Sequence, residues 1–159
     1  MIGGIAQTPF ASPSPLLESR IMNDQVSKQS QARIKAMLDA FANAFTQGDG
    51  KGAAACWEVP ALIVSDDGNR AVSALSEIEA FFGNAASEYN AKGITGTRPE
   101  IQALTWLTER LATVQVRWPY LDAKGVAQRE SESSMYVLRL NGSGDPKICV
   151  SVMMGASKG

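Results

Sequence analysis

The spacing of apolar residues changes once along this chain, and this change constrains the fold more than any other feature. Up to about residue 93 apolar side chains recur at helical intervals, whereas from residue 101 to 154 they alternate with polar ones. Intervals of three and four residues are typical of helices, and a period of two is typical of strands. The sequence therefore predicts helices first and a block of strands after them, as in an α+β domain.

The first predicted helix covers residues 25–47. Its apolar side chains fall at steps of four, three and four and form one stripe, made of Ile34, Leu38, Phe41 and Phe45. Gly48 ends this helix, and Asp49 is placed to cap a short second one.

Residues 1–24 are rich in Pro, Ser and Gly. We therefore expect a flexible N-terminal arm, or one that packs on a partner subunit, followed by a single domain over residues 25–159.

A third helix is predicted from residue 76. Ser76 and Glu79 have the spacing of a capping box, in which a hydroxyl and a carboxylate bind free backbone amides at a helix start. An apolar face at helical spacing follows, made of Ile78, Phe81, Phe82, Ala85 and Tyr89, and Gly93 is placed to end the helix. Before this helix we expect a hairpin with strands at residues 61–64 and 70–72. Pro60 would separate that hairpin from the second helix.

Four strands are predicted at residues 101–108, 111–120, 129–140 and 147–154. No long crossover separates them, so they should form an antiparallel meander with the helices on one face. The last strand has apolar residues in both alternating sets, which indicates cover on both sides. A homodimer through the sheet explains this cover better than a monomer does, and the alternative is cover by the N-terminal arm.

The chain contains no histidine, which excludes Ser-His-Asp and Cys-His catalysis and His-ligated zinc. Cys56 and Cys149 fit no metal spacing, so two buried free thiols are the simplest interpretation, with a disulfide or a nucleophile as alternatives. We expect no metal and no organic cofactor.

The charge and hydropathy pattern limits the partners of the chain. The net charge of -1 comes without a basic stripe, so no nucleic-acid partner is expected. No apolar run approaches the roughly 18 residues of a membrane span, and the N-terminus lacks a basic region of the signal-peptide kind. A cytoplasmic protein without a membrane partner is the expectation.

Several motifs together resemble the nuclear transport factor 2-like superfamily over roughly residues 30–154. They are the Gly48-Asp49 break, the Ser76-x-x-Glu79 helix entry, the hairpin from Trp118 to Gly125, and a meander ending in residues 147–152. The resemblance implies a curved antiparallel sheet wrapped around about three helices as a cystatin-like α+β cone, usually dimeric through the sheet, with an apolar pocket inside. Members include ketosteroid isomerase, scytalone dehydratase, limonene epoxide hydrolase, polyketide cyclases and non-catalytic modules, so the fold does not decide the function.

The resemblance also indicates where acid–base residues would lie. Phe41 stands where ketosteroid isomerase has a donor tyrosine, and the base of that family falls at Ser65, with Asp66 and Asp67 immediately beyond. A reaction of that mechanism is therefore disfavoured. Asp66 or Asp67 could act as a base if an apolar cavity raised its pKa. The ordinary alternative is a turn in which these carboxylates bind nearby backbone.

Aromatic residues from different predicted elements would come near one cavity, either as plain core or as the wall of a ligand pocket. The ligand-binding candidates are Phe41, Trp57, Phe81, Trp106 and Trp118. Tyr89 and Tyr136 are the candidate catalytic donors, because a buried hydroxyl needs a partner.

Charged and polar residues in the strands leave the direction of several side chains open. Arg117 lies between Val116 and Trp118 in an alternating strand, so it points away from the helices, and an ion pair with Glu132 on the outer face is expected. A polar patch follows in the next strand, made of Glu130, Ser131, Glu132, Ser133 and Ser134. Only one of its two alternating sets can face the pocket, and the strand register decides which.

Two functional hypotheses follow from the sequence. In the first, the protein binds an apolar small molecule and acts on it as an isomerase, cyclase or dehydratase-like enzyme. In the second, it is a non-catalytic binding or dimerisation module whose pocket is filled by its own aromatic side chains. An open cavity that contains both a carboxylate and a hydroxyl would favour the first.

Overall fold

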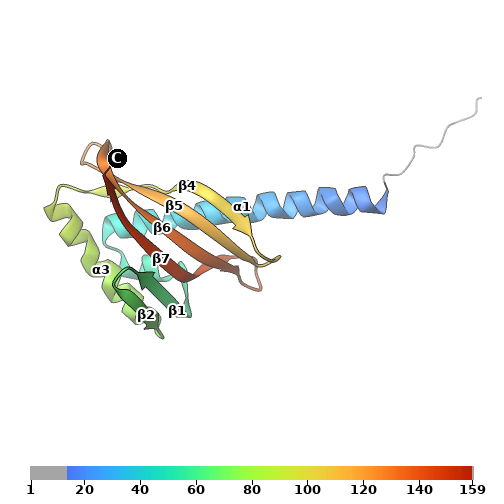
Figure 1. Ribbon diagram of the computed structural model, residues 1–159, viewed down its shortest axis with the longest axis horizontal. Helices are drawn as coiled ribbons and strands as arrows, with labels where there is room; N and C mark the ends of the chain where they lie inside the picture. Colours follow the sequence, from blue (N-terminus) through green and yellow to red (C-terminus); the bar gives the residue numbers. More distant parts are fainter. Residues whose placement is uncertain (1–13, 159) are drawn as a thin grey trace, which may run out of the picture.

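The computed structural model describes residues 14–158, which form three helices and seven strands (Figure 1). In chain order these elements are α1 (Pro15–Gln47), α2 (Gly50–Ala54), β1 (Trp57–Ser65), β2 (Gly68–Val72), α3 (Leu75–Ala91), β3 (Gly96–Thr97), β4 (Glu100–Trp106), β5 (Leu111–Leu121), β6 (Ala127–Leu140) and β7 (Pro146–Lys158). Within this range, no helix combines the length and the apolar character needed to cross a membrane.

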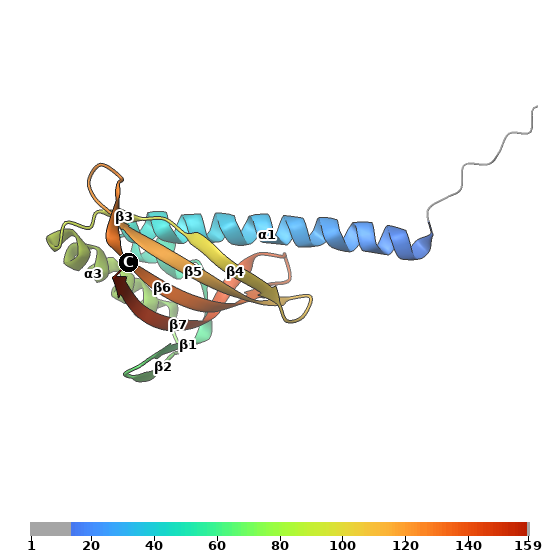
Figure 2. The ribbon, with the colours of Figure 1, turned by 45° about the horizontal axis from the view of Figure 1, so that its top comes forward.

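Helix α1 begins at Pro15, well before the predicted start near residue 25. The Ser14 hydroxyl accepts a hydrogen bond from the Leu17 amide, and proline suits the first turn because its missing N–H would be unpaired there anyway. The predicted arm over residues 1–24 therefore falls partly in this helix and partly outside the described residues. The start of α1 extends beyond the rest of the domain (Figures 1 and 2) and its side chains are exposed up to Gln29.

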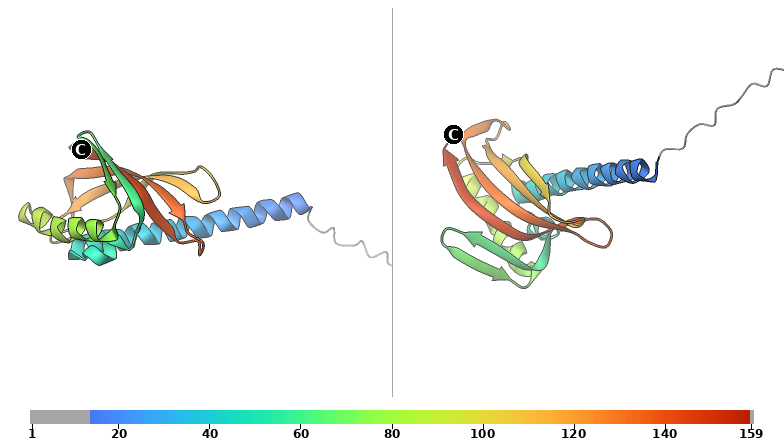
Figure 3. Two further views of the ribbon diagram at one scale, coloured as in Figure 1. Left: turned by 90° about the horizontal axis from the view of Figure 1, so that it is seen from below. Right: turned by 45° about the vertical axis from the view of Figure 1, so that its right-hand side comes forward.

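One curved sheet packs against the helices, and Figure 3 shows its curvature from two sides. The strand order is β2-β1-β7-β6-β5-β3, and β4 also pairs with β5. Strands β4 to β7 form the predicted antiparallel meander, whereas β1 and β7 run parallel. The predicted α+β fold, a curved sheet around three helices, is confirmed.

Strand β1 includes Pro60, which was predicted to lie outside it. The ladder between β1 and β7 is irregular between Trp57 and Leu62. Pro60 falls in this gap, where a residue without an N–H removes no hydrogen bond from the ladder. The strand therefore starts at Trp57, so this side chain is held by the sheet rather than by the end of a helix.

Glu77, and not Glu79, caps the start of α3. Its carboxylate accepts hydrogen bonds from the amides of Ser73 (3.0 Å) and Ala74 (3.1 Å). The predicted Ser76–Glu79 capping box is wrong, because Ser76 already lies inside the first turn. The predicted cap of α2 is confirmed, since Asp49 Oδ1 accepts from the Gly52 amide at 3.0 Å.

Helices α2 and α3 touch backbone to backbone at Gly50. A Cβ atom on this residue would lie 2.2 Å from the carbonyl oxygen of Glu79, so only glycine allows this approach. The contact fixes α3 beside the end of α1, where it forms one wall of the cavity described below.

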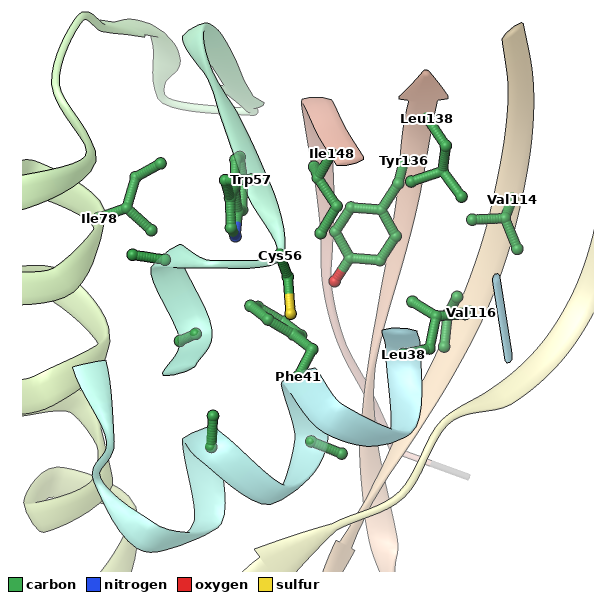
Figure 4. Close-up of a cluster of buried hydrophobic side chains, with 14 of the residues drawn as sticks. Leu38, Phe41, Cys56, Trp57, Ile78, Val114, Val116, Tyr136, Leu138 and Ile148 are labelled. Atoms are coloured by element: carbon green, nitrogen blue, oxygen red, sulfur yellow. The ribbon is translucent and has the colours of Figure 1, made fainter. Parts of the chain in front are cut away.

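The core lies between α1 and the inner face of the sheet (Figure 4). The predicted stripe of α1 is buried at Ile34, Leu38 and Phe41. It meets side chains of the central strands, which include Val114, Val116, Leu138 and Ile148. Full burial of each such side chain contributes about 1.5–3 kcal/mol, so this cluster anchors the sheet to α1.

Candidate functional site

A cavity of about 380 Å³ opens between α3, the end of α1 and the inner face of the sheet. Its wall is mainly aromatic and apolar, with a few polar groups. The lining residues are Phe41, Ala42, Phe45, Trp57, Ile63, Phe81, Phe82, Asn84, Ala85, Glu88, Tyr89, Thr97, Trp118, Tyr120, Glu132, Ser134, Tyr136, Ser151 and Met153. Small-molecule sites in proteins are in general concave and mainly apolar, with volumes of about 300–1,000 Å³.

Glu132 supplies a carboxylate to the cavity from β6. It lies directly opposite Trp118 on β5, and directly paired residues share one face of a sheet, so both side chains point inward. Tyr120, two residues after Trp118, donates a hydrogen bond of 2.6 Å to Glu132 Oε1. Tyr89 on α3 donates to the same oxygen. Three elements therefore meet at one carboxylate, which we call the Glu132 cluster (Glu132, Tyr89 and Tyr120).

The two tyrosines of this cluster stay protonated over a wide pH range. Burial raises the pKa of both phenols above the usual value, and the hydrogen bond to the Glu132 carboxylate raises it further. Both hydroxyls are therefore neutral donors near neutral pH, and they use their protons on Glu132 Oε1. Oε2 accepts no hydrogen bond from residues 14–158, so it is open to a ligand.

Aromatic rings form the other part of the cavity. Phe41 packs edge to face on Phe82 with ring centroids 5.0 Å apart, and it lies 6.0 Å from Trp118. Trp118 Nε1 donates a hydrogen bond of 3.1 Å to the Tyr136 hydroxyl. Burial raises the pKa of Tyr136 to about 12, so this hydroxyl is also protonated near neutral pH. These aromatic side chains pack against one another along the cavity wall and do not fill the cavity.

Comparison with family models gives the identity of the fold. Residues 29–156 match the family described as NTF2-like protein (DUF6841), which is well over half of the chain. The chain belongs to this NTF2-like family. A search of curated proteins found no match to the sequence.

Solved structures similar to this NTF2-like domain share its fold at low sequence identity. A domain of unknown function with a cystatin-like fold from Nostoc punctiforme has a TM-score of 0.61 at 20% identity, over 79% of this chain and 76% of that one. A ketosteroid isomerase-like protein from Erwinia carotovora atroseptica has a TM-score of 0.56 at 16% identity, over 77% and 93% of the two chains. A candidate scytalone dehydratase from Novosphingobium aromaticivorans has a TM-score of 0.60 at 9% identity, over 86% and 91%. At these identities the likeness shows the fold alone.

Most of the candidate residues from the sequence line the cavity of the NTF2-like domain. They are Phe41, Trp57, Phe81, Tyr89, Trp118 and Tyr136. Trp106 on β4 does not line it and instead packs, half-buried, against the core cluster. The chemical roles assigned to these residues stay predictions.

Asp66 and Asp67 do not reach the cavity, so their proposed place in an apolar pocket is wrong. Both side chains are exposed in the turn between β1 and β2, at the tip of the hairpin. The Asp67 amide donates to the Ser65 hydroxyl at 3.3 Å, a local turn contact. The turn lies at the tip of the β1–β2 hairpin (Figure 2), and neither aspartate is among the residues that line the cavity.

Among the polar cavity residues, Tyr120 was not considered from the sequence, and Glu132 belonged to the polar patch whose direction was left open. Arg117 does point to the outer face, as expected, but its ion pair is with Glu100 at 2.6 Å and not with Glu132. The signal for Glu132 was the alternation of buried residues in β6, since Tyr136 and Leu138 extend back by steps of two to Ser134 and Glu132.

The two cysteines are free, and their sulfur atoms lie against backbone carbonyls. Cys56 is buried, and burial raises the pKa of its thiol to about 11. Cys149 is half-buried, contrary to the expectation of two buried thiols, and burial raises its pKa too. Over residues 14–158, His, Cys, Asp and Glu side chains form no group of three that could hold a metal ion.

Proposed function

We propose that this NTF2-like domain binds an apolar small molecule that carries a hydrogen-bond donor, such as a hydroxyl, and that the Glu132 cluster holds that polar end. The observation that supports this most directly is an open aromatic cavity in which the Glu132 carboxylate has a free Oε2; the exposed Glu88 also lines the cavity but takes no part in the Glu132 cluster. Pockets of this kind orient a mostly apolar ligand through a few polar groups.

The geometry of the Glu132 cluster favours a ligand that donates to it. The protons of Tyr89 and Tyr120 are both used on Oε1, so the free sites of the cluster are acceptors: Oε2 and the phenolic oxygens. A hydrogen bond to a charged group contributes about 1.5–3 kcal/mol. An alcohol or phenol is therefore expected to bind more tightly than the parent hydrocarbon.

Proton transfer by Glu132 is the reaction class that we propose for the site. A carboxylate oxygen that faces a cavity, and whose partner oxygen is fixed by two donors, is positioned to take a proton from a bound molecule. In this proposal the general base is Glu132 instead of Asp66 or Asp67. The ketosteroid isomerase-like and dehydratase-type neighbours share this fold, which is compatible with such a site. The alternative function is binding of the small molecule without a reaction.

Binding is tested by calorimetry with 4-cyclohexylphenol and cyclohexylbenzene. The wild type and E100Q, which changes a glutamate of the outer face, should bind the phenol at least about tenfold more tightly than the hydrocarbon. E132Q should lose this preference. Equal affinities in the wild type would overturn the role of the Glu132 cluster.

Proton transfer is tested separately with 4-phenylcyclohexanone in deuterated water. Exchange of the protons next to the carbonyl is followed by proton NMR with the wild type, E100Q and E132Q. A catalytic Glu132 accelerates exchange in the first two proteins only. If exchange with all three proteins is no faster than in buffer without protein, the proposed proton transfer is wrong and the protein is a binding module.

We also infer that the domain forms a homodimer through its sheet. The outer face carries six apolar side chains at paired positions of β1, β7 and β6, which we call the outer patch: Leu62, Val64, Met135, Val137, Val150 and Val152. The ion pairs Arg117–Glu100 and Arg139–Glu58 put both signs of charge around it. In a two-fold symmetric dimer, the outer patch of one copy would pack against the outer patch of the other. The charged residues around the two patches could then form ion pairs between the copies.

A further inference from the structure

The indole N–H of Trp57 is a buried donor with no partner. Trp57 is 3% exposed, and across residues 14–158 its Nε1 is the buried side-chain nitrogen or oxygen atom that makes no hydrogen bond. A buried donor left unpaired costs about 1–3 kcal/mol, and such groups in native proteins commonly mark a functional site. Trp57 is also part of the cavity wall, so a bound molecule can supply the missing acceptor.

Tyr136 provides a second donor to the same region. Its hydroxyl oxygen already accepts from Trp118 Nε1, so its own proton is left to donate to a ligand. In Figure 4 the indole nitrogen of Trp57 and the hydroxyl oxygen of Tyr136 are both directed toward Phe41, between the helices and the sheet. This part of the cavity therefore offers hydrogen-bond donors, whereas the Glu132 cluster offers acceptors.

The two polar regions lie at different positions along the sheet, with Tyr136 nearer to Glu132 than Trp57 is. Trp57 pairs with Ile148, which pairs with Leu138, six residues along β6 from Glu132. The backbone path is about 20 Å at about 3.3 Å per residue, but the side chains shorten the gap: the rings of Trp57 and Phe41 lie 6.4 Å apart, those of Phe41 and Trp118 lie 6.0 Å apart, and Trp118 is the strand partner of Glu132. The rings between the two regions are apolar, so the cavity is suited to an elongated molecule.

We propose that Trp57 is a specificity-determining residue that donates its indole N–H to an acceptor oxygen of the ligand, with Tyr136 as the second donor. This inference rests on the proposed binding function and narrows the ligand class. The ligand is an elongated, mainly apolar molecule with a carbonyl or ether oxygen at one end and a hydroxyl at the other. The first binds at Trp57 and the second at Glu132.

Four matched probes separate these contributions. 4-(4-Hydroxyphenyl)cyclohexanone carries both the carbonyl and the hydroxyl. 4-Phenylcyclohexanone carries only the carbonyl, 4-cyclohexylphenol carries only the hydroxyl, and cyclohexylbenzene carries neither. Calorimetry with the wild type should show about tenfold tighter binding for each probe with a carbonyl than for its counterpart without one. W57F keeps an aromatic ring but loses the donor, so it should lose this preference and keep the preference for the hydroxyl. W106F is the matched control and should behave as the wild type, because Trp106 does not line the cavity.

A spectroscopic measurement on the wild type makes the test independent of the stability of W57F. The chain has three tryptophans, so its nitrogen–proton correlation spectrum has three indole signals, which W106F and W118F assign by elimination. The Trp57 signal should shift to lower field with 4-phenylcyclohexanone and not with cyclohexylbenzene.

The outcomes distinguish this inference from the function on which it rests. Equal affinity for ketone and hydrocarbon, with an unshifted Trp57 signal, would overturn the role of Trp57, while a hydroxyl preference that depends on Glu132 would still support the binding function. No binding of any of the four probes would overturn both.

Discussion

The Tyr120 hydroxyl donates a hydrogen bond of 2.6 Å to the carboxylate of Glu132 from the neighbouring strand. The two residues are diagonal neighbours on the inner face, because Glu132 pairs directly with Trp118. Tyr89 reaches the same oxygen from α3, so the carboxylate joins the sheet to a helix. This arrangement fixes the side chain of Glu132 before any ligand is bound, which is what an oriented binding site needs.

Removal of the charge of Glu132 should lower the pKa of two tyrosines. All three tyrosines of the chain line the cavity. Burial is the largest cause of the raised pKa at all three tyrosines, but in E132Q Tyr89 and Tyr120 also lose a hydrogen-bonded carboxylate, whereas Tyr136 loses only the weaker effect of a charge that it does not contact. Ultraviolet titration of tyrosinate in the wild type and E132Q measures this. Identical curves would show that the cluster does not form in solution.

The stability of the fold should decrease in alkaline solution. The folded state raises the pKa of all three tyrosines above the usual value of about 10, so above that pH the unfolded chain releases protons that the folded chain retains. The free energy of unfolding therefore falls as the pH rises from about 10 through the folded-state values. Urea unfolding from pH 8 upward measures it. Y136F should flatten the dependence, and a wild-type stability that is constant to pH 11 would contradict the expectation.

Asp66 and Asp67 should be dispensable for binding and stability. Both side chains are exposed in a turn outside the cavity. D66N and D67N are expected to change the free energy of unfolding by no more than about 0.5 kcal/mol and to leave the affinity for 4-cyclohexylphenol unchanged. Urea unfolding and calorimetry check this, with E132Q as the positive control. A loss of affinity in either variant would indicate that the polar group that binds the ligand lies in the β1–β2 turn.

Phe41 and Phe81 should differ strongly in their contribution to stability. Phe41 is 6% exposed and packs on three aromatic rings, whereas Phe81 is 45% exposed at the cavity wall. F41A should lower the free energy of unfolding by about 3–5 kcal/mol, the usual cost of a large core deletion. F81A should lower it by about 1 kcal/mol or less, since half of its surface is already in water. Denaturant unfolding of both variants gives the comparison, and similar losses would contradict the position of Phe41 in the core.

The proposed homodimer should depend on the outer patch and not on the exposed start of α1. V150K places a charge in the centre of the patch and should give a monomer in light scattering at micromolar concentration. L16K changes an apolar residue that is 80% exposed on α1 and should leave the dimer intact. A wild-type monomer, or a dimer lost only in L16K, would rule out the sheet interface.

Local sequence signals were sufficient to predict every element except the two-residue strand β3, and to predict their order. The stripe through Ile34, Leu38 and Phe41, and the alternation in the last four strands, depend only on which neighbours share a face. The same holds for the cap at Asp49, which contacts an amide three residues away. The start of α1 and the cap of α3 were misplaced because more than one nearby residue could serve, and small local energies decide between them.

The identity of the residues that line the candidate site depended on tertiary structure. Tyr89, Tyr120 and Glu132 are distant in sequence, and they meet only because the register of β5 with β6 and the packing of α3 bring them together. The alternation in β6 was visible in the sequence, but the face that it presents to the cavity was not, because a shift of one residue in register exchanges the two faces. The sequence by itself thus determined an α+β cone with aromatic residues inside it and without histidine chemistry. Only the tertiary structure decided that Glu132 lines the cavity and that Asp66 and Asp67 do not, because strand register and helix packing are set by contacts across the whole domain.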